Sequence, residues 1–181
     1  MSLEEMTFFL DIPLETPIEV NPEDTSDSYT EQIILQQTLN YLAAKLSGMD
    51  TEVKTVYQSN VIHGYQEAVG DMADIFVSLQ IKVKPDLQQS VGVIRYFNER
   101  FEDSQFLASH VLYRLKHSKW FAKLLVKVED CPVEINEHTS SLIVAICLGN
   151  DLLCTYNQDQ DDFIEQLVNM LLYSITDRYE E

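Results

Sequence analysis

The stretch that decides the fold reads DIFVSLQIKVK, from Asp74 to Lys84. Its odd-numbered positions, beginning with Ile75, are all aliphatic, whereas its even-numbered positions from Ser78 onward are polar. Because successive side chains of a strand point to opposite faces of the sheet, this alternation predicts a strand with one buried and one wet face. Pro85 ends the strand, since proline has no backbone N–H to donate.

Two amphipathic helices are predicted, one before and one after this strand along the chain. The first covers about residues 29–47, with capping-box spacing from Ser28 to Glu31 and Gly48 as a stop. Its apolar stripe is Leu35, Leu39, Leu42 and Leu46. The second covers about residues 160–178, where apolar side chains recur at helical spacing. Acidic residues that favour a helix start precede them: Asp159, Asp161 and Asp162.

Shorter patterns predict the remaining elements. Residues 6–12 are apolar enough for an edge strand, and residues 13–28 form an extended acidic arm, because Pro13, Pro17 and Pro22 remove ladder donors. Alternation favours strands at residues 52–59 and 120–128. Helical spacing predicts two further helices, one opened by Asp86 and Gln89 that buries Val91, Ile94 and Phe97, and one opened by Asp103 or Ser104 that buries Leu107, Val111 and Leu115.

A hairpin is predicted near the C-terminal end. Residues 142–148 and 152–156 read as strands around the turn Gly149-Asn150-Asp151. That register places Cys147 opposite Cys154, and we expect both to be thiols in a reducing compartment. The cysteines are odd in number and lack zinc-ligand spacing, so we expect neither a disulfide framework nor a metal site.

These elements predict the α+β class: a mostly antiparallel sheet with amphipathic helices packed on one face. A chain of 181 residues with 45% apolar composition has the size of one domain and can bury a core without staples, so residues 1–181 are expected to form a single domain. No basic segment opens the sequence, and no run of about 18 apolar residues occurs. We therefore expect a cytoplasmic protein that does not enter a membrane.

The charge is distributed unevenly along the chain. Residues 1–50 contain ten Asp or Glu against one basic residue, and residues 131–181 also contain ten against one. Residues 51–130 balance at ten against ten, and the net charge is −18. Such a charge repels nucleic acid phosphates and anionic lipid and attracts basic proteins. A basic protein partner is therefore favoured over nucleic acid.

The leading functional prediction is a non-catalytic acidic protein-binding module, meaning a chaperone, adaptor or inhibitor of the immunity-protein type. It would dock a basic partner through its carboxylate-rich ends, where charge complementarity raises the association rate. The residues expected to contact the partner are Glu15, Glu19, Glu23, Asp24, Asp27, Asp159, Asp161, Asp162 and Glu165. An inhibitor that mimics nucleic acid and blocks a DNA-binding enzyme would use the same carboxylates.

A third hypothesis is a structural subunit of a homo-oligomer, in which the acidic ends of one copy meet the basic middle of the next. The basic residues concentrate between Lys82 and Lys127. If the strands at 74–84 and 120–128 are neighbours, their wet faces form one basic patch of Lys82, Lys84, Lys123 and Lys127.

An enzymatic alternative rests on Asp74 and Lys82. With Gln80 between them they resemble the PD-(D/E)xK pattern of metal-dependent nucleases, which implies a nuclease or phosphohydrolase in which acidic groups hold Mg²⁺ and the lysine steadies the attacking water. Gln80 stands where the family has its second acid. The chain contains no nucleophile elbow, no glycine-rich phosphate loop and no paired histidines with a glutamate, so no cofactor is expected.

Overall fold

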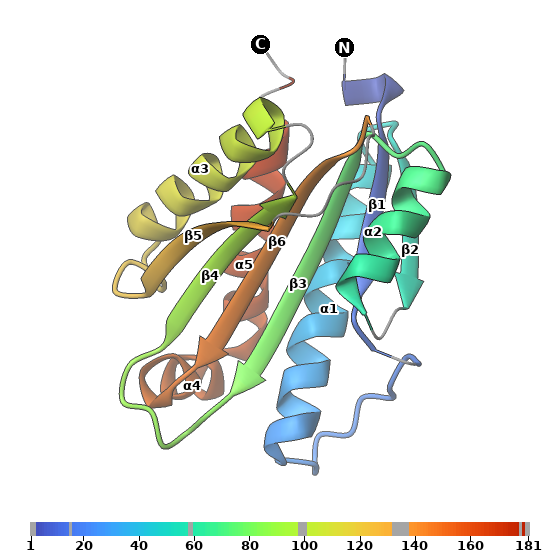
Figure 1. The fold of residues 1–181 in the computed structure, drawn as a ribbon. Coiled ribbons are helices and arrows are strands. Elements are labelled where there is room, and N and C mark those ends of the chain that lie inside the picture. Colours follow the sequence, from blue (N-terminus) through green and yellow to red (C-terminus); the bar gives the residue numbers. More distant parts are fainter. Residues whose placement is uncertain are drawn as a thin grey trace.

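The computed structural model describes residues 3–14, 16–57, 60–97, 101–131, 138–177 and 179. Its described strands form one six-stranded sheet in the order β2-β1-β3-β6-β4-β5 (Figure 1). The strands are β1 (Thr7–Ile12), β2 (Glu52–Tyr57), β3 (Ile75–Val83), β4 (Val91–Phe97), β5 (Leu125–Cys131) and β6 (Ser140–Leu148). A short 3-10 turn, Leu3–Glu5, precedes β1.

The sheet is mostly parallel, and the prediction of a mostly antiparallel α+β sheet is wrong. Strands β1, β2, β3 and β6 run parallel, β4 pairs antiparallel with β6, and β5 pairs parallel with β4. The physical reason lies in the connections. Parallel neighbours need a crossover of a dozen or more residues, usually a helix, and α1 (Asp27–Ser47) and α2 (Val61–Gly70) provide such crossovers. The chain is a single mixed α/β domain.

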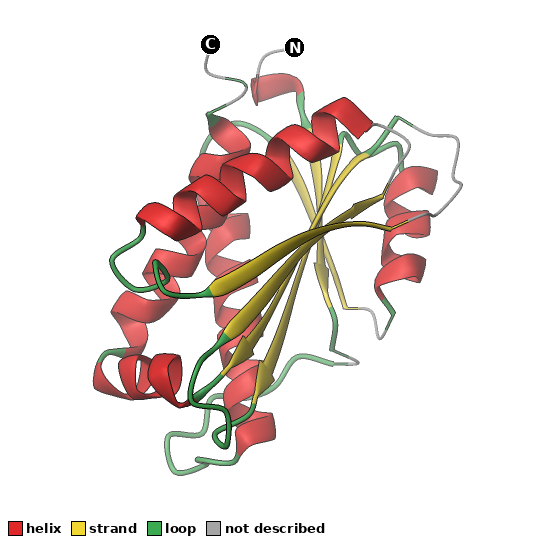
Figure 2. Ribbon diagram, turned by 60° about the vertical axis from the view of Figure 1, so that its left-hand side comes forward, coloured by secondary structure: helices red, strands yellow, loops and turns green. Residues whose placement is uncertain are grey.

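Helices cover both faces of the sheet, so the prediction that they pack on one face is also wrong. The larger core cluster contains side chains of α1, α3 (Phe101–His117), α4 (Asn150–Gln158) and α5 (Gln160–Thr176). The smaller cluster lies on the opposite face and contains Tyr65 and Ala68 of α2. Figure 2 shows this arrangement, with one helix alone on its side of the sheet. Sequence analysis missed α2.

The alternation in β3 is confirmed for its apolar face. Its odd positions from Ile75 to Val83 join the larger core cluster. The other face is divided, because Phe76 and Ser78 are buried whereas Gln80 is partly exposed and Lys82 is exposed. Only the second half of β3 therefore has a wet face. Strand β1 is an interior strand rather than an edge, since it pairs with both β2 and β3.

The predicted helix over Val91 to Phe97 is a strand, β4. Its residues alternate between the two faces: Ile94 packs in the larger core cluster, and Phe97 packs in the smaller one. Segments of this length fit a helical and an extended pattern equally well, and pairing with β6 and β5 decides between them. The predicted strand at 120–128 begins only at Leu125, because residues 119–123 form turns after α3.

The predicted hairpin is wrong as well, because the second segment is helix α4. Gly149 is the N-cap of α4, where its N–H donates to Ser90 Oγ at 2.8 Å. Asp151 accepts from the same hydroxyl and from the N–H of Ser90. Glycine and asparagine thus start a helix here. Cys147 lies on β6 and Cys154 on α4, and both are free thiols.

Replacement of Gly149 by alanine should destabilise the protein. A Cβ added there would lie 2.8 Å from the carbonyl oxygen of Leu87 and 2.9 Å from the carbonyl carbon of Gln89. Both are backbone atoms, which cannot relieve the clash by a change of side-chain rotamer. We expect Gly149→Ala to lower the free energy of unfolding by about 1–3 kcal/mol in urea denaturation. The control is Gly70→Ala at the end of α2, where nothing lies within 4 Å. Equal stability of the two variants would contradict this close approach.

Candidate functional site

The order of the strands identifies one place where a ligand can bind. From β1 the chain crosses through α1 to β2 on one side, and then returns through α2 to β3 on the other side of β1. At their carboxyl ends, β1 leads through α1 to β2 on one side, whereas β3 leads toward β4 on the other side, so the two connections diverge between β1 and β3. In open α/β sheets, ligands bind in the crevice outside the strand ends at such a switch point.

A pocket of about 450 Å³ lies at this place, and we call it the sheet groove. The loop after β1 and the first turns of α1 form one wall, and β3, β6 and β4 form the floor. Its lining residues are Pro13, Leu14, Ser28, Glu31, Gln32, Leu35, Gln80, Ile81, Lys82, Val91, Val93, Ala145, Ile146 and Cys147. In Figure 1, α2 lies in front of β1, and no described helix lies in front of the lower halves of β3, β6 and β4.

The strand register defines two rows of side chains across the floor. Paired residues of neighbouring strands point to the same face. One row consists of Lys82, Cys147, Val91 and Leu125. The next row consists of Gln80, Ala145, Val93 and Lys127. Each row therefore has a polar side chain on β3 and two small or aliphatic side chains in its centre.

Glu31 joins the wall to the floor. Its Oε1 accepts a hydrogen bond of 2.8 Å from the N–H of Val83, and its Oε2 lies 3.6 Å from Lys82 Nζ. The Glu31 side chain is only 19% exposed, whereas that of Lys82 is 73% exposed. The carboxylate is therefore held in place by the end of β3, while the lysine extends into solvent. Among the described residues, the Gln80 amide has no hydrogen-bond partner, which leaves it available to a ligand.

A fully buried carboxyl group lies beside the sheet groove. Asp11 on β1 pairs in register with Ser78, whose hydroxyl donates to Asp11 Oδ2 at 3.0 Å. The other oxygen, Oδ1, has no partner among the described residues. Burial raises the pKa of Asp11 to about 7, Ser78 opposes this rise through its hydrogen bond, and the charge of Glu67 adds to it. Ser78 precedes Gln80 by two residues on the same face of β3.

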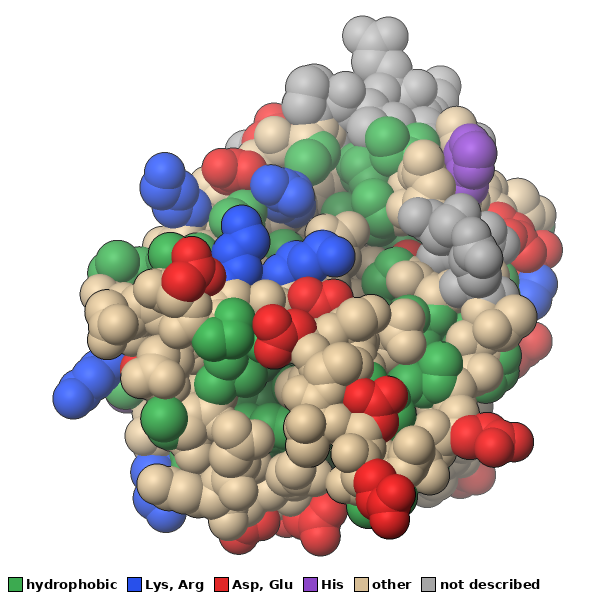
Figure 3. All heavy atoms as spheres, turned by 90° about the horizontal axis from the view of Figure 1, so that it is seen from below, with side chains coloured by type: hydrophobic (Ala, Val, Ile, Leu, Met, Phe, Trp, Pro, Cys, Tyr) green, Lys and Arg blue, Asp and Glu red, His purple; other side chains and the backbone are tan. Residues whose placement is uncertain are grey.

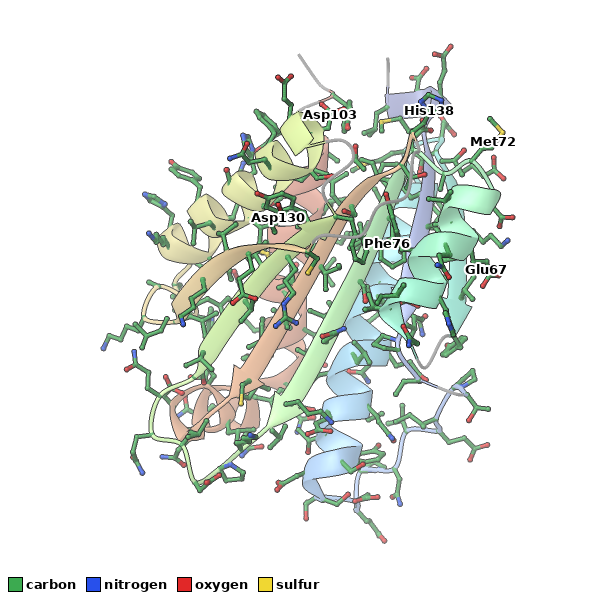
Figure 4. The ribbon with its side chains drawn as sticks, viewed as in Figure 1. Glu67, Met72, Phe76, Asp103, Asp130 and His138 are labelled. Atoms are coloured by element: carbon green, nitrogen blue, oxygen red, sulfur yellow. The ribbon has the colours of Figure 1, made fainter. Side chains whose placement is uncertain are left out.

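Helix α2 packs directly over this carboxyl group. A Cβ at Gly64 would lie 2.8 Å from Asp11 Oδ1, so glycine permits the close approach. Tyr65 stacks on Phe97 at 4.4 Å and meets Phe76 edge-on at 5.5 Å, and its hydroxyl donates to the carbonyl of Thr139. In Figure 4, Phe76 lies under α2, and the labelled His138 lies at the end of the sheet away from the groove. Helix α2 thus closes one half of this face and leaves the other half open.

The structure does not bring the nuclease candidates together. Asp74 and Lys82 lie at opposite ends of β3, eight residues apart, which corresponds to about 26 Å along a strand. Asp74 Oδ2 accepts from the N–H of Thr7 at 2.8 Å and thus holds the start of β1. The prediction of a metal-dependent nuclease built on these residues is therefore wrong.

The basic patch is not assembled as predicted, because β6 and β4 separate β3 from β5. Lys82 and Lys127 share a face at the two sides of the sheet groove. Lys84 follows β3 and donates its backbone N–H to Leu148. Lys123 lies in the turns before β5, where its carbonyl accepts from Gln89.

The predicted partner-binding acids remain on the surface. Asp24 Oδ1 accepts from the N–H of Ser26, and this bond lowers the pKa of Asp24. Asp159 caps α5 by accepting from the N–H of Asp162 at 3.0 Å. Glu15 lies outside the described residues. The other predicted side chains, Glu19, Glu23, Asp27, Asp161 and Glu165, are exposed.

Comparisons with known proteins identify the fold. No family model matches the chain, and no curated protein matches it in sequence. Among solved structures, N-acetylmuramoyl-L-alanine amidase AmiC2 of Nostoc punctiforme superposes with a TM-score of 0.68 at 10% identity, covering 97% of this chain and 98% of that one. The N-acetylmuramoyl-L-alanine amidase from Clostridium difficile 630 gives 0.67 at 16% identity, covering 98% of each chain. The CwlD amidase from Clostridioides difficile, in complex with the GerS lipoprotein, gives 0.61 at 16% identity, covering 97% and 98%.

This chain therefore has the fold of amidase catalytic domains over nearly its whole length. The prediction of a non-catalytic acidic chaperone, adaptor or inhibitor is wrong, and so are its nucleic-acid-mimic and structural-subunit alternatives, because the matched fold is that of cell-wall amidases. Charge distribution misled the prediction, since net charge reports solubility and association rather than fold. None of the helices in the described ranges is long and apolar enough to span a bilayer.

The described residues do not fit a hydrolytic metal centre. A catalytic metal needs about three protein ligands and an open position for water. No group of three or more His, Cys, Asp or Glu side chains among the described residues could hold a metal ion. In the sheet groove, the lining side chains of these types are Glu31 and Cys147, and no histidine accompanies them. We therefore derive no step through a metal.

Sequence analysis missed several residues of this site. Glu31 was assigned only to a capping box, although it holds the end of β3. Asp11 is the single carboxyl group within the apolar run of β1, and this position in the sequence indicates a buried carboxyl group. Helix α2 had a readable stripe of Val61, Tyr65 and Ala68 at helical spacing.

Asp11→Asn should change how stability depends on pH. The folded protein keeps the Asp11 proton up to about pH 7, whereas the unfolded chain releases it near 3.8. Rising pH within that window therefore favours unfolding of the wild type, by up to about 4 kcal/mol. Asparagine does not titrate, so the variant should gain stability relative to the wild type from pH 5 to pH 8 in urea denaturation. Asp161→Asn on the exposed start of α5 is the control, and parallel curves for wild type and Asp11→Asn would contradict the buried acid.

Proposed function

We propose that this protein binds an amide-bearing peptide in the sheet groove, and that its ligand is a muramoyl peptide of the kind named for its structural neighbours. The observation that carries the proposal is the location of the groove. It opens at the switch point between β1 and β3 in a chain with the fold of N-acetylmuramoyl-L-alanine amidases. The side chains of the groove themselves support an amide-bearing ligand.

The groove has the composition of a ligand site. Its floor is apolar at Ala145, Val91 and Val93, and a small number of polar groups surround that floor. The Gln80 side chain offers two N–H donors and one carbonyl acceptor, so it can pair with either a carbonyl or an N–H of a peptide. Glu31 supplies a fixed carboxylate that can accept a ligand N–H. These features support binding of an amide group across β3.

The proposal covers the binding step. Hydrolysis of an amide needs an activated nucleophile, either a metal-bound water or a side chain with an adjacent base. The described lining residues provide neither arrangement, so no hydrolytic step is assigned to them.

A protein partner for this chain stays a prediction. The CwlD amidase of Clostridioides difficile is seen in complex with the GerS lipoprotein, which shows that one protein of this fold has a protein partner. A basic partner for the present chain would be detected by capture at low salt and release at rising salt.

Calorimetric titration with N-acetylmuramoyl-L-alanyl-D-isoglutamine tests the proposed ligand. We expect saturable binding to the wild type, and we expect Gln80→Leu to weaken it about 3- to 10-fold, since one peptide hydrogen bond is lost. The matched control is Gln105→Leu on α3, which is exposed and outside the groove. That variant should bind like the wild type.

The same samples should be assayed for cleavage. Release of L-alanyl-D-isoglutamine is measured by chromatography, with and without added Zn²⁺. Absence of binding by the wild type, or equal weakening by Gln80→Leu and Gln105→Leu, would contradict the proposed site. Cleavage that survives Gln80→Leu unchanged would also count against it, because turnover would then occur elsewhere.

A further inference from the structure

The sheet groove is flanked by basic side chains on a protein that is otherwise strongly acidic. Lys82 lies at its β3 side and Lys127 at its β5 side, on the same face of the sheet. Arg95 lies on that face as well but is paired with Glu129 at 3.2 Å. Seen from the carboxyl ends of β1, β3 and β6, Lys and Arg side chains gather beside hydrophobic surface, with acidic side chains next to them (Figure 3). This face therefore differs in charge from the acidic ends of the chain.

The two lysines are separated by an apolar strip. Strands β3 and β5 are three strand spacings apart, which corresponds to about 14 Å. The side chains between them are those of Ala145, Cys147, Val91 and Val93. A ligand that lies across the strands would thus place an apolar portion on the strip and reach a cation at either end.

The Lys82 ammonium is available to such a ligand. Its partner in the present structure is Glu31, at 3.6 Å, and the lysine side chain is 73% exposed. Exposed ion pairs are weak, so little is lost when Lys82 turns from Glu31 to a ligand carboxylate. Glu31 remains hydrogen bonded to the N–H of Val83 after that exchange and is not left without a partner. The groove can therefore bind an anion at Lys82 while the Glu31 carboxylate keeps its hydrogen bond to the N–H of Val83.

We infer that the ligand class of the sheet groove is a carboxylate-bearing peptide, with a carboxylate bound by Lys82, an apolar part on the strip, and Lys127 as a second cation across the floor. The inference rests on the proposed function for the location of the ligand. The lysines that flank the groove favour a carboxylate, because a lysine and a carboxylate form a charge-assisted hydrogen bond.

A ligand series that differs only in charge tests the inference. The series is N-acetylmuramoyl-L-alanyl-D-glutamate with two carboxylates, its D-isoglutamine analogue with one, and its diamide with none. We expect the dissociation constant to rise about tenfold or more from the dicarboxylate to the diamide. Lys82→Gln should remove most of that difference and Lys127→Gln a smaller part. Neither change should affect binding of the diamide.

The control variant is Lys116→Gln at the end of α3, which removes the same charge away from the groove and should leave the whole series unchanged. All three lysines are exposed, and circular dichroism checks that each variant keeps its fold. Equal affinity of the three ligands, or a Lys116→Gln effect as large as that of Lys82→Gln, would overturn the inference and leave the proposed muramoyl ligand standing.

Acetyl-L-alanyl-D-glutamate, which lacks the sugar, separates the two proposals. If it binds as tightly as the muramoyl form and depends on Lys82, the carboxylate inference holds and the muramoyl assignment fails. If neither form binds to the wild type, both proposals fail.

Discussion

Parallel pairing of β1, β3 and β6 is the constraint on which the rest of the structure depends. These strands form the middle of the sheet, and β3 pairs with β6 along its full length from Ile75 to Val83. Parallel neighbours cannot be joined by tight turns, so the chain must cross between them through helices. The chain leaves β1 toward β2 and leaves β3 toward β4, on opposite sides, and the groove lies at the carboxyl ends of β1 and β3, where these connections diverge. The position of the site is thus a consequence of strand direction.

Helix α2 decides how much of the second face is open. It packs over Asp11 and Phe76, and the glycine at Gly64 allows the helix backbone to approach the buried carboxyl group. A buried acid with one oxygen unpartnered is costly when ionised, and the protein relieves that cost by retaining the proton. Helix α2 does not cover the carboxyl-terminal half of β3, and there Gln80 and Lys82 reach solvent. Closing one half of the face and opening the other are therefore two effects of the same packing.

The fold and the chemistry of this chain support different conclusions. Its shape is that of cell-wall amidases over nearly the entire chain, yet a fold hosts many functions and the site must be argued from its own residues. Those residues are the hydrogen-bonded carboxylate of Glu31, the side-chain amide of Gln80, the exposed ammonium of Lys82 and an apolar floor. We propose that such a set binds a peptide and its carboxylate, while the described residues contain no assembled metal-ligand set. The groove residues therefore support the proposed binding step, and no hydrolytic step is assigned to them.

Local sequence determined the elements with long, regular patterns: α1, α5, α3 and the apolar face of β3 follow from apolar spacing and capping residues. It did not determine β4 and α4, since short segments such as Val91–Phe97 and Asn150–Gln158 fit more than one pattern until neighbouring strands supply their hydrogen bonds. Strand direction was also decided only by the tertiary structure, because alternation is the same in parallel and antiparallel strands. The groove belongs to that second category. Glu31, Gln80 and Lys82 were visible in the sequence, but their meeting at one strand end depends on the crossing of α1, which no local pattern encodes.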